Sequence, residues 1–290
     1  MRNTPSRSCH TLSRKGRIDH SQVLHSKEHP IMSQHHISWT IERPSLRRHI
    51  LERGTVALHW LALGNPALVE IAEASGAEGV VLDLQHGLWE RAALEAALRP
   101  ISGAPWRLVR LADHDRAGIT TALDAGADGI IAPLVENAGQ ARDIVASARF
   151  APAGKRSVGG IRPLSGNLAE YLKKSNDNTA VGVMIETVAG LEVAEDIAAT
   201  PGLDFIFIGA GDLAVDLGEF PDPGPRLAAA LHRILSACQT RGIGCGIYSY
   251  SGENARSRRA EGFAITVMAS DVTAAQSGFR AAAAAYTQIT

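Results

Sequence analysis

Two acidic residues, Glu186 and Asp212, each follow a short apolar run and lie one strand-helix-strand unit apart in the sequence. In a parallel β/α barrel the ends of such strands meet at one rim, so the two carboxylates would lie close together. Two buried negative charges in one place are unfavourable unless a cation neutralises them. We therefore expect Glu186 and Asp212 to share a divalent metal ion.

The type of ligand indicates which metal and which substrate would bind. Carboxylate oxygens favour Mg²⁺, Mn²⁺ or Co²⁺, whereas zinc favours His and Cys. Two protein ligands leave positions open for a bidentate α-keto acid and water. Ala210 and Gly211, just before Asp212, form a turn whose exposed N–H groups would attract the substrate carboxylate. A plain turn between a strand and a helix is the alternative.

Two further polar residues lie where predicted strands end. His86 follows the run Val-Val-Leu-Asp-Leu-Gln at residues 80–85, and Arg110 ends the run Leu-Val-Arg. Arg110 can stabilise the oxygen of an enolate, and His86 can act as a base, directly or through a water molecule. Each also has a structural alternative, as a helix cap, an ion-pair partner or a packed side chain. Together they indicate carbanion chemistry through a metal-bound enolate.

A Schiff base to lysine is the other route to the same carbanion. None of the lysines ends a predicted strand, so the metal route is favoured. The lysines of the chain are Lys15, Lys27, Lys155, Lys173 and Lys174.

The chain after Pro44 alternates short apolar runs with segments of helical period. This alternation predicts a (β/α)8 TIM barrel of the phosphoenolpyruvate/pyruvate type, although a doubly wound fold has a similar alternation. No dinucleotide-binding fingerprint opens a helix, since the glycines at 242–246 lie in a predicted strand. Predicted strands are 55–60, 78–84, 106–111, 128–133, 180–186, 204–209, 243–248 and 263–268. Predicted helices are 45–53, 66–75, 90–99, 115–125, 137–149, 167–175, 187–198, 225–241, 252–261 and 271–287.

Composition narrows the class of protein and of partner. The 290 residues, 45% of them hydrophobic, suit one barrel domain, which we place at 41–290. A net charge of −1 and 5% aromatic residues argue against a nucleic-acid partner. No apolar stretch reaches the roughly 20 residues that a membrane helix needs. The three cysteines have neither zinc nor disulfide spacing, which suits a reducing compartment, so we expect a cytoplasmic protein. The low net charge and low aromatic content leave small molecules as the expected partners.

Residues 1–40 differ from the rest because they are rich in Ser, His, Arg and Lys and have no sustained hydrophobic period. We expect a disordered N-terminal extension. A transit peptide, or a start codon upstream of a true initiator at Met32, would explain the same composition.

Six motifs of the chain, in order and at compatible spacing, resemble the HpcH/HpaI aldolase family. They read Leu-Asp-Leu-Gln-His-Gly, Leu-Val-Arg, Ala-Pro-Leu-Val-Glu-Asn-Ala, Pro-Ala-Gly-Lys-Arg-Ser-Val-Gly, Met-Ile-Glu-Thr and Phe-Ile-Gly-Ala-Gly-Asp-Leu, at 82–87, 108–110, 132–138, 152–159, 184–187 and 207–213. This family of class II, pyruvate-dependent aldolases includes 4-hydroxy-2-oxoheptanedioate aldolase and 2-dehydro-3-deoxyglucarate aldolase. The resemblance implies reversible cleavage of a 4-hydroxy-2-oxo acid to pyruvate and an aldehyde, in a homo-oligomer that is often hexameric.

The resemblance also implies roles for individual residues. It assigns the metal ligands to Glu186 and Asp212, the catalytic histidine to His86 and the enolate-stabilising arginine to Arg110. Three further positions follow from the resemblance alone: Asp124 as the acid that pairs with the histidine, Asp83 as another active-site acid, and Trp60 as an aromatic residue near the pocket. For Asp124 and Trp60 the residues by themselves equally suggest a solvated helix position and a packing role.

Two departures from the family pattern concern the pyruvate end of the site. Met184 stands where some members carry Gln, and Ala210-Gly211 replaces a Gly-Pro-containing turn. The basic loop at 155–162 is a candidate for binding a distal carboxylate or phosphate of the aldehyde, with a lid or a subunit contact as alternatives. The competing functions are a citrate-lyase-like or malyl-CoA-like lyase, for which that loop would hold the CoA phosphates, and a non-catalytic barrel that binds keto acids.

Overall fold

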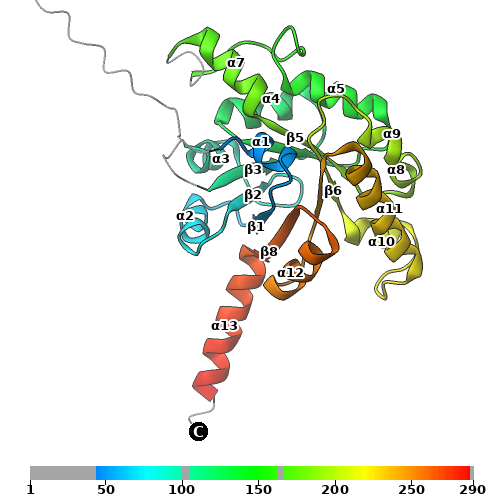
Figure 1. The fold of residues 1–290 in the computed structure, drawn as a ribbon. Helices are drawn as coiled ribbons and strands as arrows, with labels where there is room; N and C mark the ends of the chain where they lie inside the picture. Colours follow the sequence, from blue (N-terminus) through cyan, green and yellow to red (C-terminus); the bar gives the residue numbers. More distant parts are fainter. Residues whose placement is uncertain (1–43, 100–104, 162–165, 288–290) are drawn as a thin grey trace, which may run out of the picture. The chain divides into compact units, whose positions relative to one another are not determined.

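The computed structural model describes residues 44–99, 105–161 and 166–287. Eight parallel strands pair in sequence order and close into a barrel (Figure 1). The predicted TIM barrel is therefore confirmed, and the doubly wound alternative is wrong. The strands are β1 (Val56–Leu61), β2 (Gly79–Asp83), β3 (Trp106–Arg110), β4 (Gly129–Ala132), β5 (Ala180–Ile185), β6 (Phe205–Ile208), β7 (Gly244–Ile247) and β8 (Ile265–Ser270). The predicted extension, residues 1–40, lies outside the described part of the chain.

Helices surround the strands, and their ends follow local sequence signals. Asp115 and Asn137 cap α4 and α5 by accepting backbone N–H groups, and α4 ends at Gly126, whose positive φ favours glycine. The helices are α1 (Leu46–Leu51), α2 (Pro66–Ala74), α3 (Arg91–Ala97), α4 (Arg116–Ala125), α5 (Ala138–Ala148), α7 (Leu168–Asn178), α8 (Val188–Glu192), α9 (Ala194–Ala198), α10 (Ala210–Asp216), α11 (Pro225–Arg241), α12 (Gly252–Glu261) and α13 (Asp271–Thr287).

The structure differs from the predicted elements in two places. The single helix expected at 187–198 is interrupted at Val193, whose backbone (φ −119°, ψ 23°) is not helical, so α8 and α9 are separate. The expected turn after β6 extends into a helix, α10. Because α10 starts at Ala210, Asp212 lies in the first turn of a helix rather than in a loop.

The core has two layers, as expected when a closed sheet is covered by helices. Leu58, Leu108, Phe205 and Phe207 belong to the cluster inside the barrel, while a larger cluster fills the space between strands and helices. Gly182 is required by this packing, because a Cβ there would lie 2.1 Å from the Phe205 ring. The barrel interior is therefore filled with side chains, and the reactive groups must lie at its ends.

The N-terminal end of the barrel is closed by α1. Its apolar residues Leu46 and Ile50 pack with the interior cluster. Arg47 of α1 donates to Asp204 Oδ1 (Nε to Oδ1, 2.8 Å), and Arg149 and the Val181 N–H donate to Oδ2 at 3.0 and 2.9 Å. The carboxylate of Asp204, which is 1% exposed, thereby fastens α1 to the barrel.

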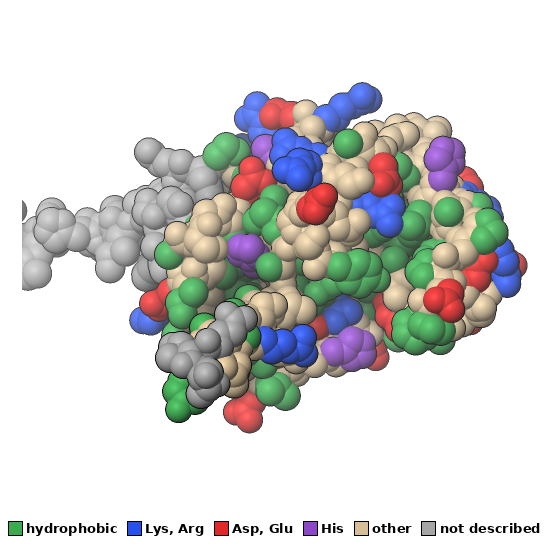
Figure 2. Space-filling view, turned by 90° about the horizontal axis from the view of Figure 1, so that it is seen from below, with side chains coloured by type: hydrophobic (Ala, Val, Ile, Leu, Met, Phe, Trp, Pro, Cys, Tyr) green, Lys and Arg blue, Asp and Glu red, His purple; other side chains and the backbone are tan. Residues whose placement is uncertain are grey.

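The C-terminal helix α13 does not cover the barrel. It packs against β1 and β8 only near its start and then extends away from the strands (Figure 1). Phe279 and Tyr286 are 77% and 81% exposed. Within the described ranges, no helix has both the length and the apolar character needed to cross a bilayer. On the face shown in Figure 2, acidic, basic and hydrophobic side chains are interspersed.

Replacing Asp204 by Ala is expected to lower the free energy of unfolding by about 3–5 kcal/mol, because it leaves buried Arg149 without its carboxylate. Denaturant-induced unfolding followed by circular dichroism would measure the change. The control is Glu52→Ala, which removes an exposed partner of Arg48 and should cost less than about 0.5 kcal/mol. Equal losses in the two variants would show that the Asp204 contacts do not stabilise the barrel.

Candidate functional site

The sequence-predicted polar residues at the strand ends lie at one rim of the barrel. Asp83 and Arg110 are the last residues of β2 and β3, Glu186 directly follows β5, and Asp212 lies two residues into α10, after β6. Since all eight strands are parallel, their carboxyl ends share one end of the barrel. The site is therefore assembled from four different strands.

The most closely connected residues of the rim are Asp83 and Arg110, which are 2% and 8% exposed. Arg110 Nε donates to Asp83 Oδ1 at 2.8 Å, and Nη2 donates to the other oxygen. Trp60 completes the group, because its indole N–H donates to Asp83 Oδ2 at 3.1 Å and the guanidinium carbon lies 4.9 Å from its ring centroid. The guanidinium is thus held in one orientation by a carboxylate and an aromatic face.

The environment of Asp83 keeps it ionised. Burial alone would raise the pKa of Asp83, but the hydrogen bonds and charge of Arg110, together with the Trp60 and His86 N–H groups, hold that pKa below its ordinary value. The Gln85 and His86 N–H groups donate to Asp83 Oδ1 at 3.0 and 3.3 Å. Asp83 therefore also fixes the backbone that carries the exposed His86 side chain.

Glu186 is held in a different way. Its Oε1 accepts the Leu134 N–H at 2.7 Å, and Leu134 has an unusual positive φ of 55° for a residue with a side chain. Its Oε2 is buried and has no hydrogen-bond partner among the described residues. A Cβ at residue 209 would lie 2.6 Å from Oε2, so Gly209 is required beside this oxygen.

The charge balance at Glu186 fits a cation. Burial raises the pKa of Glu186, the Leu134 N–H lowers it, and the nearby charge of Asp212 raises it further. Two interacting carboxylates with one buried, unpartnered oxygen form a donor set suited to a hard divalent ion. No group of three or more His, Cys, Asp or Glu residues with metal-site geometry occurs in the described part of the chain, so the candidate ligands are two. Met184 lies in the interior cluster near Gly209 and supplies no oxygen.

Asp124 lies away from the other predicted site residues of this chain. It is the penultimate residue of α4, which runs from the rim back toward the other end of the barrel. Its carboxylate accepts from Arg156 Nη2 at 2.7 Å. His86 follows β2 at the rim, so α4 places Asp124 near the opposite end of the same barrel. Arg156 is 4% exposed, and its guanidinium also contacts Phe150 and Tyr171.

Two contributors to the site escape sequence reasoning. The Leu134 N–H is a backbone group, and nothing in the side chains of residues 132–138 reports the conformation that aims it at Glu186. Tyr248 follows β7 and contacts the Trp60 ring edge-on, with centroids 5.7 Å apart. Its position at the end of a glycine-rich predicted strand was the signal that the sequence offered.

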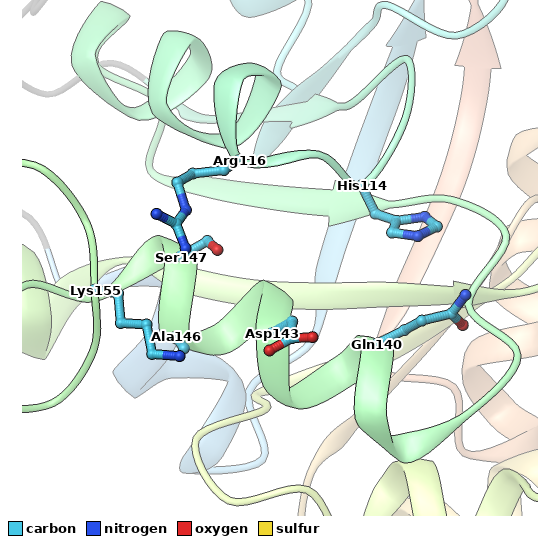
Figure 3. A pocket seen from close by; sticks show the side chains of 7 residues that line it. All are labelled: His114, Arg116, Gln140, Asp143, Ala146, Ser147 and Lys155. Carbon is cyan, nitrogen blue, oxygen red and sulfur yellow. The ribbon is translucent and has the colours of Figure 1, made fainter.

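A separate pocket of about 370 Å³ lies on the outer side of the rim, between α4 and α5 (Figure 3). Arg116 and Lys155 lie toward one end, His114 and Gln140 toward the other, and Asp143 lies between them. Of the residues that the sequence suggested for binding, only Lys155 of the basic loop is among those that line this pocket. His114 Nδ1 is 3.3 Å from the Pro133 carbonyl oxygen, so the pocket adjoins the turn that presents Leu134.

Comparison with known proteins identifies the family of this chain. Residues 57–277 match the family described as HpcH/HpaI aldolase/citrate lyase. The chain belongs to this family. As a family member it is an enzyme of the carbon-carbon lyase class, and the resemblance inferred from the motifs is confirmed.

Relatives and solved structures of the HpcH/HpaI family cover most of the barrel. A hydroxypyruvate/pyruvate aldolase of Paraburkholderia phytofirmans is 33% identical over 73% of this chain and 86% of its own length. A 4-hydroxy-2-oxovalerate aldolase of Novosphingobium aromaticivorans is 36% identical over 58% of this chain and 66% of its own length. The crystal structure of a family protein from Burkholderia cenocepacia superposes with a TM-score of 0.78 at 29% identity, covering 83% of this chain and 98% of that one.

Replacing Asp83 by Asn is expected to destabilise this aldolase-family protein by about 3 kcal/mol at pH 7, because Arg110 stays buried without a negative partner. The pKa of Asp83 is lowered by folding, so the stabilisation is present above the unfolded pKa of about 3.9 and is lost as the pH falls through the lower folded value. Unfolding curves at pH 7 and at steps down to about pH 3.5 would measure the difference between variant and wild type. A difference that grows on acidification would contradict the proposed pairing.

Proposed function

We propose that this protein is a divalent-metal-dependent, class II aldolase that reversibly cleaves a 4-hydroxy-2-oxo acid to pyruvate and an aldehyde. The observation that carries the proposal is the meeting, at one rim, of the Glu186 and Asp212 carboxylates with a guanidinium held by Asp83. The names of the relatives support the keto-acid substrate class. The rim thus combines a place for a cation with a fixed positive charge for a developing anion.

Glu186 and Asp212 are the residues proposed to hold Mg²⁺, Mn²⁺ or Co²⁺. When bound, the metal ion would polarise the keto group as a Lewis acid and so favour the development of negative charge on the carbon next to it. The unpartnered Oε2 of Glu186 and the close Asp212 charge support this assignment. The free N–H groups at the start of α10, on Ala210 and Gly211, are proposed to bind the keto-acid carboxylate.

The remaining residues are proposed to move the proton and stabilise the charge. His86 accepts the proton of the C4 hydroxyl, directly or through water, while the C3–C4 bond breaks and its electron pair passes to the keto acid fragment. Arg110 stabilises the negative charge that develops on the keto oxygen. The enolate then takes up a proton at C3 and becomes pyruvate. Asp83 and Trp60 orient Arg110 and do not exchange protons with the substrate.

A citrate-lyase-like or malyl-CoA-like reaction is the second candidate, since the family description includes citrate lyase. It would require cations for the CoA phosphates. Of the cations in the basic loop, Arg156 is buried and paired with Asp124, Lys155 lines the separate pocket between α4 and α5, and Arg162 lies outside the described residues. The buried position of Arg156 favours the aldolase reaction.

We also propose that the protein is a homo-oligomer. The exposed Phe279 and Tyr286 of α13 support assembly through this helix, as does its extension away from the barrel. A hexamer, as the family resemblance implies, is the expected state. Within one chain, α4 places Asp124 away from His86. If Asp124 pairs with a histidine, that histidine would therefore be the His86 of another subunit.

Exchange of the pyruvate methyl protons in D2O, followed by NMR, tests enolisation without an aldehyde. Exchange is expected with the wild type and Mg²⁺ or Mn²⁺, and a chelator should abolish it reversibly. His86→Ala should slow it by about 10²–10⁴-fold, because the base is lost. The matched control is His232→Ala, an exposed histidine of α11. Exchange that survives both the chelator and His86→Ala would refute the mechanism.

Binding of Mn²⁺, measured by electron paramagnetic resonance, tests the ligands independently of activity. Glu186→Gln and Asp212→Asn should each weaken binding by roughly tenfold or more, because each removes a charged oxygen ligand. Asp222→Asn, a change at an exposed carboxylate in the loop after α10, should leave the affinity unchanged. Equal affinity in all four proteins would place the metal elsewhere.

A further inference from the structure

A continuous row of aromatic rings leads from the buried arginine of the rim to the protein surface. Arg110 lies over the Trp60 ring, the Tyr248 ring contacts Trp60 edge-on, and the Tyr250 ring contacts Tyr248 edge-on with centroids 5.9 Å apart. Trp60 is 5% exposed, Tyr248 is half-buried and Tyr250 is 77% exposed. The row therefore connects the proposed position of the enolate with solvent.

Strand register places Tyr248 at the level of the reactive groups. Ile185 of β5 pairs with Ile208 of β6, and Ile208 pairs with Ile247 of β7. The next residues along the three strands are Glu186, Gly209 and Tyr248. The Tyr248 ring also packs against the interior cluster of the barrel, so it faces the barrel axis rather than the surrounding helices.

Exposed apolar side chains occur in three loops at this end of the barrel. Leu63, Leu88 and Leu134, in the loops after β1, β2 and β4, are 38%, 72% and 47% exposed. Exposed apolar groups gathered at the mouth of a site are typical of a surface that contacts an apolar ligand. Arg156, which the sequence suggested for a distal carboxylate or phosphate, is engaged by Asp124 and buried. The three leucines thus offer apolar surface to a substrate substituent, and Arg156 is already engaged by Asp124.

We propose that Tyr248 and Tyr250 form the binding surface for the aldehyde portion of the substrate, and that this portion carries an aromatic ring. The inference rests on the aldolase function proposed above and specifies its substrate class as 4-hydroxy-2-oxo acids with an aryl group at C4. An aryl group joined to C4 extends away from the keto-acid end, toward the tyrosine row. Offset or edge-to-face contacts between rings then add to the burial of apolar surface. Tyr248 and Tyr250 determine specificity and take no part in proton transfer.

The test compares cleavage of 4-hydroxy-2-oxo-4-phenylbutanoate with that of 4-hydroxy-2-oxopentanoate, which carries a methyl group in place of the ring. The wild type is expected to have a kcat/KM at least about tenfold higher for the phenyl compound, the ratio that corresponds to one good ring contact. Tyr250→Ala should reduce kcat/KM for the phenyl compound roughly tenfold, mainly through a higher KM, and leave the methyl compound unchanged. Tyr248→Phe, which keeps the ring, should retain the preference.

Controls separate this inference from the function on which it rests. Phe220→Ala removes another exposed aromatic side chain, in the loop between α10 and α11, and should leave both substrates unaffected. Methyl proton exchange of pyruvate needs no aldehyde, so Tyr250→Ala should keep the wild-type exchange rate. Two results, each with normal methyl proton exchange, would overturn the aromatic subsite alone. One is an equal kcat/KM of the wild type for the phenyl and methyl compounds. The other is an equal loss of kcat/KM for both compounds in Tyr250→Ala. Absence of exchange in the wild type would overturn the aldolase function and the subsite together.

Discussion

The buried ion pair between Asp83 and Arg110 is the interaction on which the rest of the rim depends. A guanidinium at the top of a filled barrel is tolerated only because a carboxylate and an aromatic face surround it. The same carboxylate accepts the N–H groups of Gln85 and His86. One buried charge therefore positions the proposed enolate-stabilising group and the backbone of the proposed base.

The opposite side of the rim relies on the backbone instead of an ion pair. Glu186 receives one N–H group from Leu134, whose positive φ is unfavourable in isolation, and Gly209 leaves room beside its second oxygen. On one side of the site the Asp83 carboxylate is paired with Arg110. On the other side, Glu186 and Asp212 place two carboxylates close together. This asymmetry separates a region suited to an anionic oxygen, at Arg110, from a region suited to a cation, at Glu186 and Asp212.

Much of the fold was predictable because each strand is a short apolar run that ends in a turn signal. All eight predicted strands occur within about two residues of their expected bounds. The errors fall where local signals are weak: Val193 interrupts a region of continuous helical pattern, and the turn predicted at Ala210 and Gly211 continues into the helix α10. Burial of one face by tertiary packing stabilises such short helices, and propensity alone does not report it.

The sequence by itself determined the barrel, the family, and the set of polar residues that end the strands, because these depend on periodicity and on residue type. Only the tertiary structure decided how those residues pair. Asp83 bonds Arg110, Asp124 bonds Arg156 at a distance from His86, and Leu134 turns its N–H toward Glu186. Such partners come from different strands and helices or from the backbone. Their contacts follow from strand register and helix direction in the closed barrel, which no local pattern of side chains encodes.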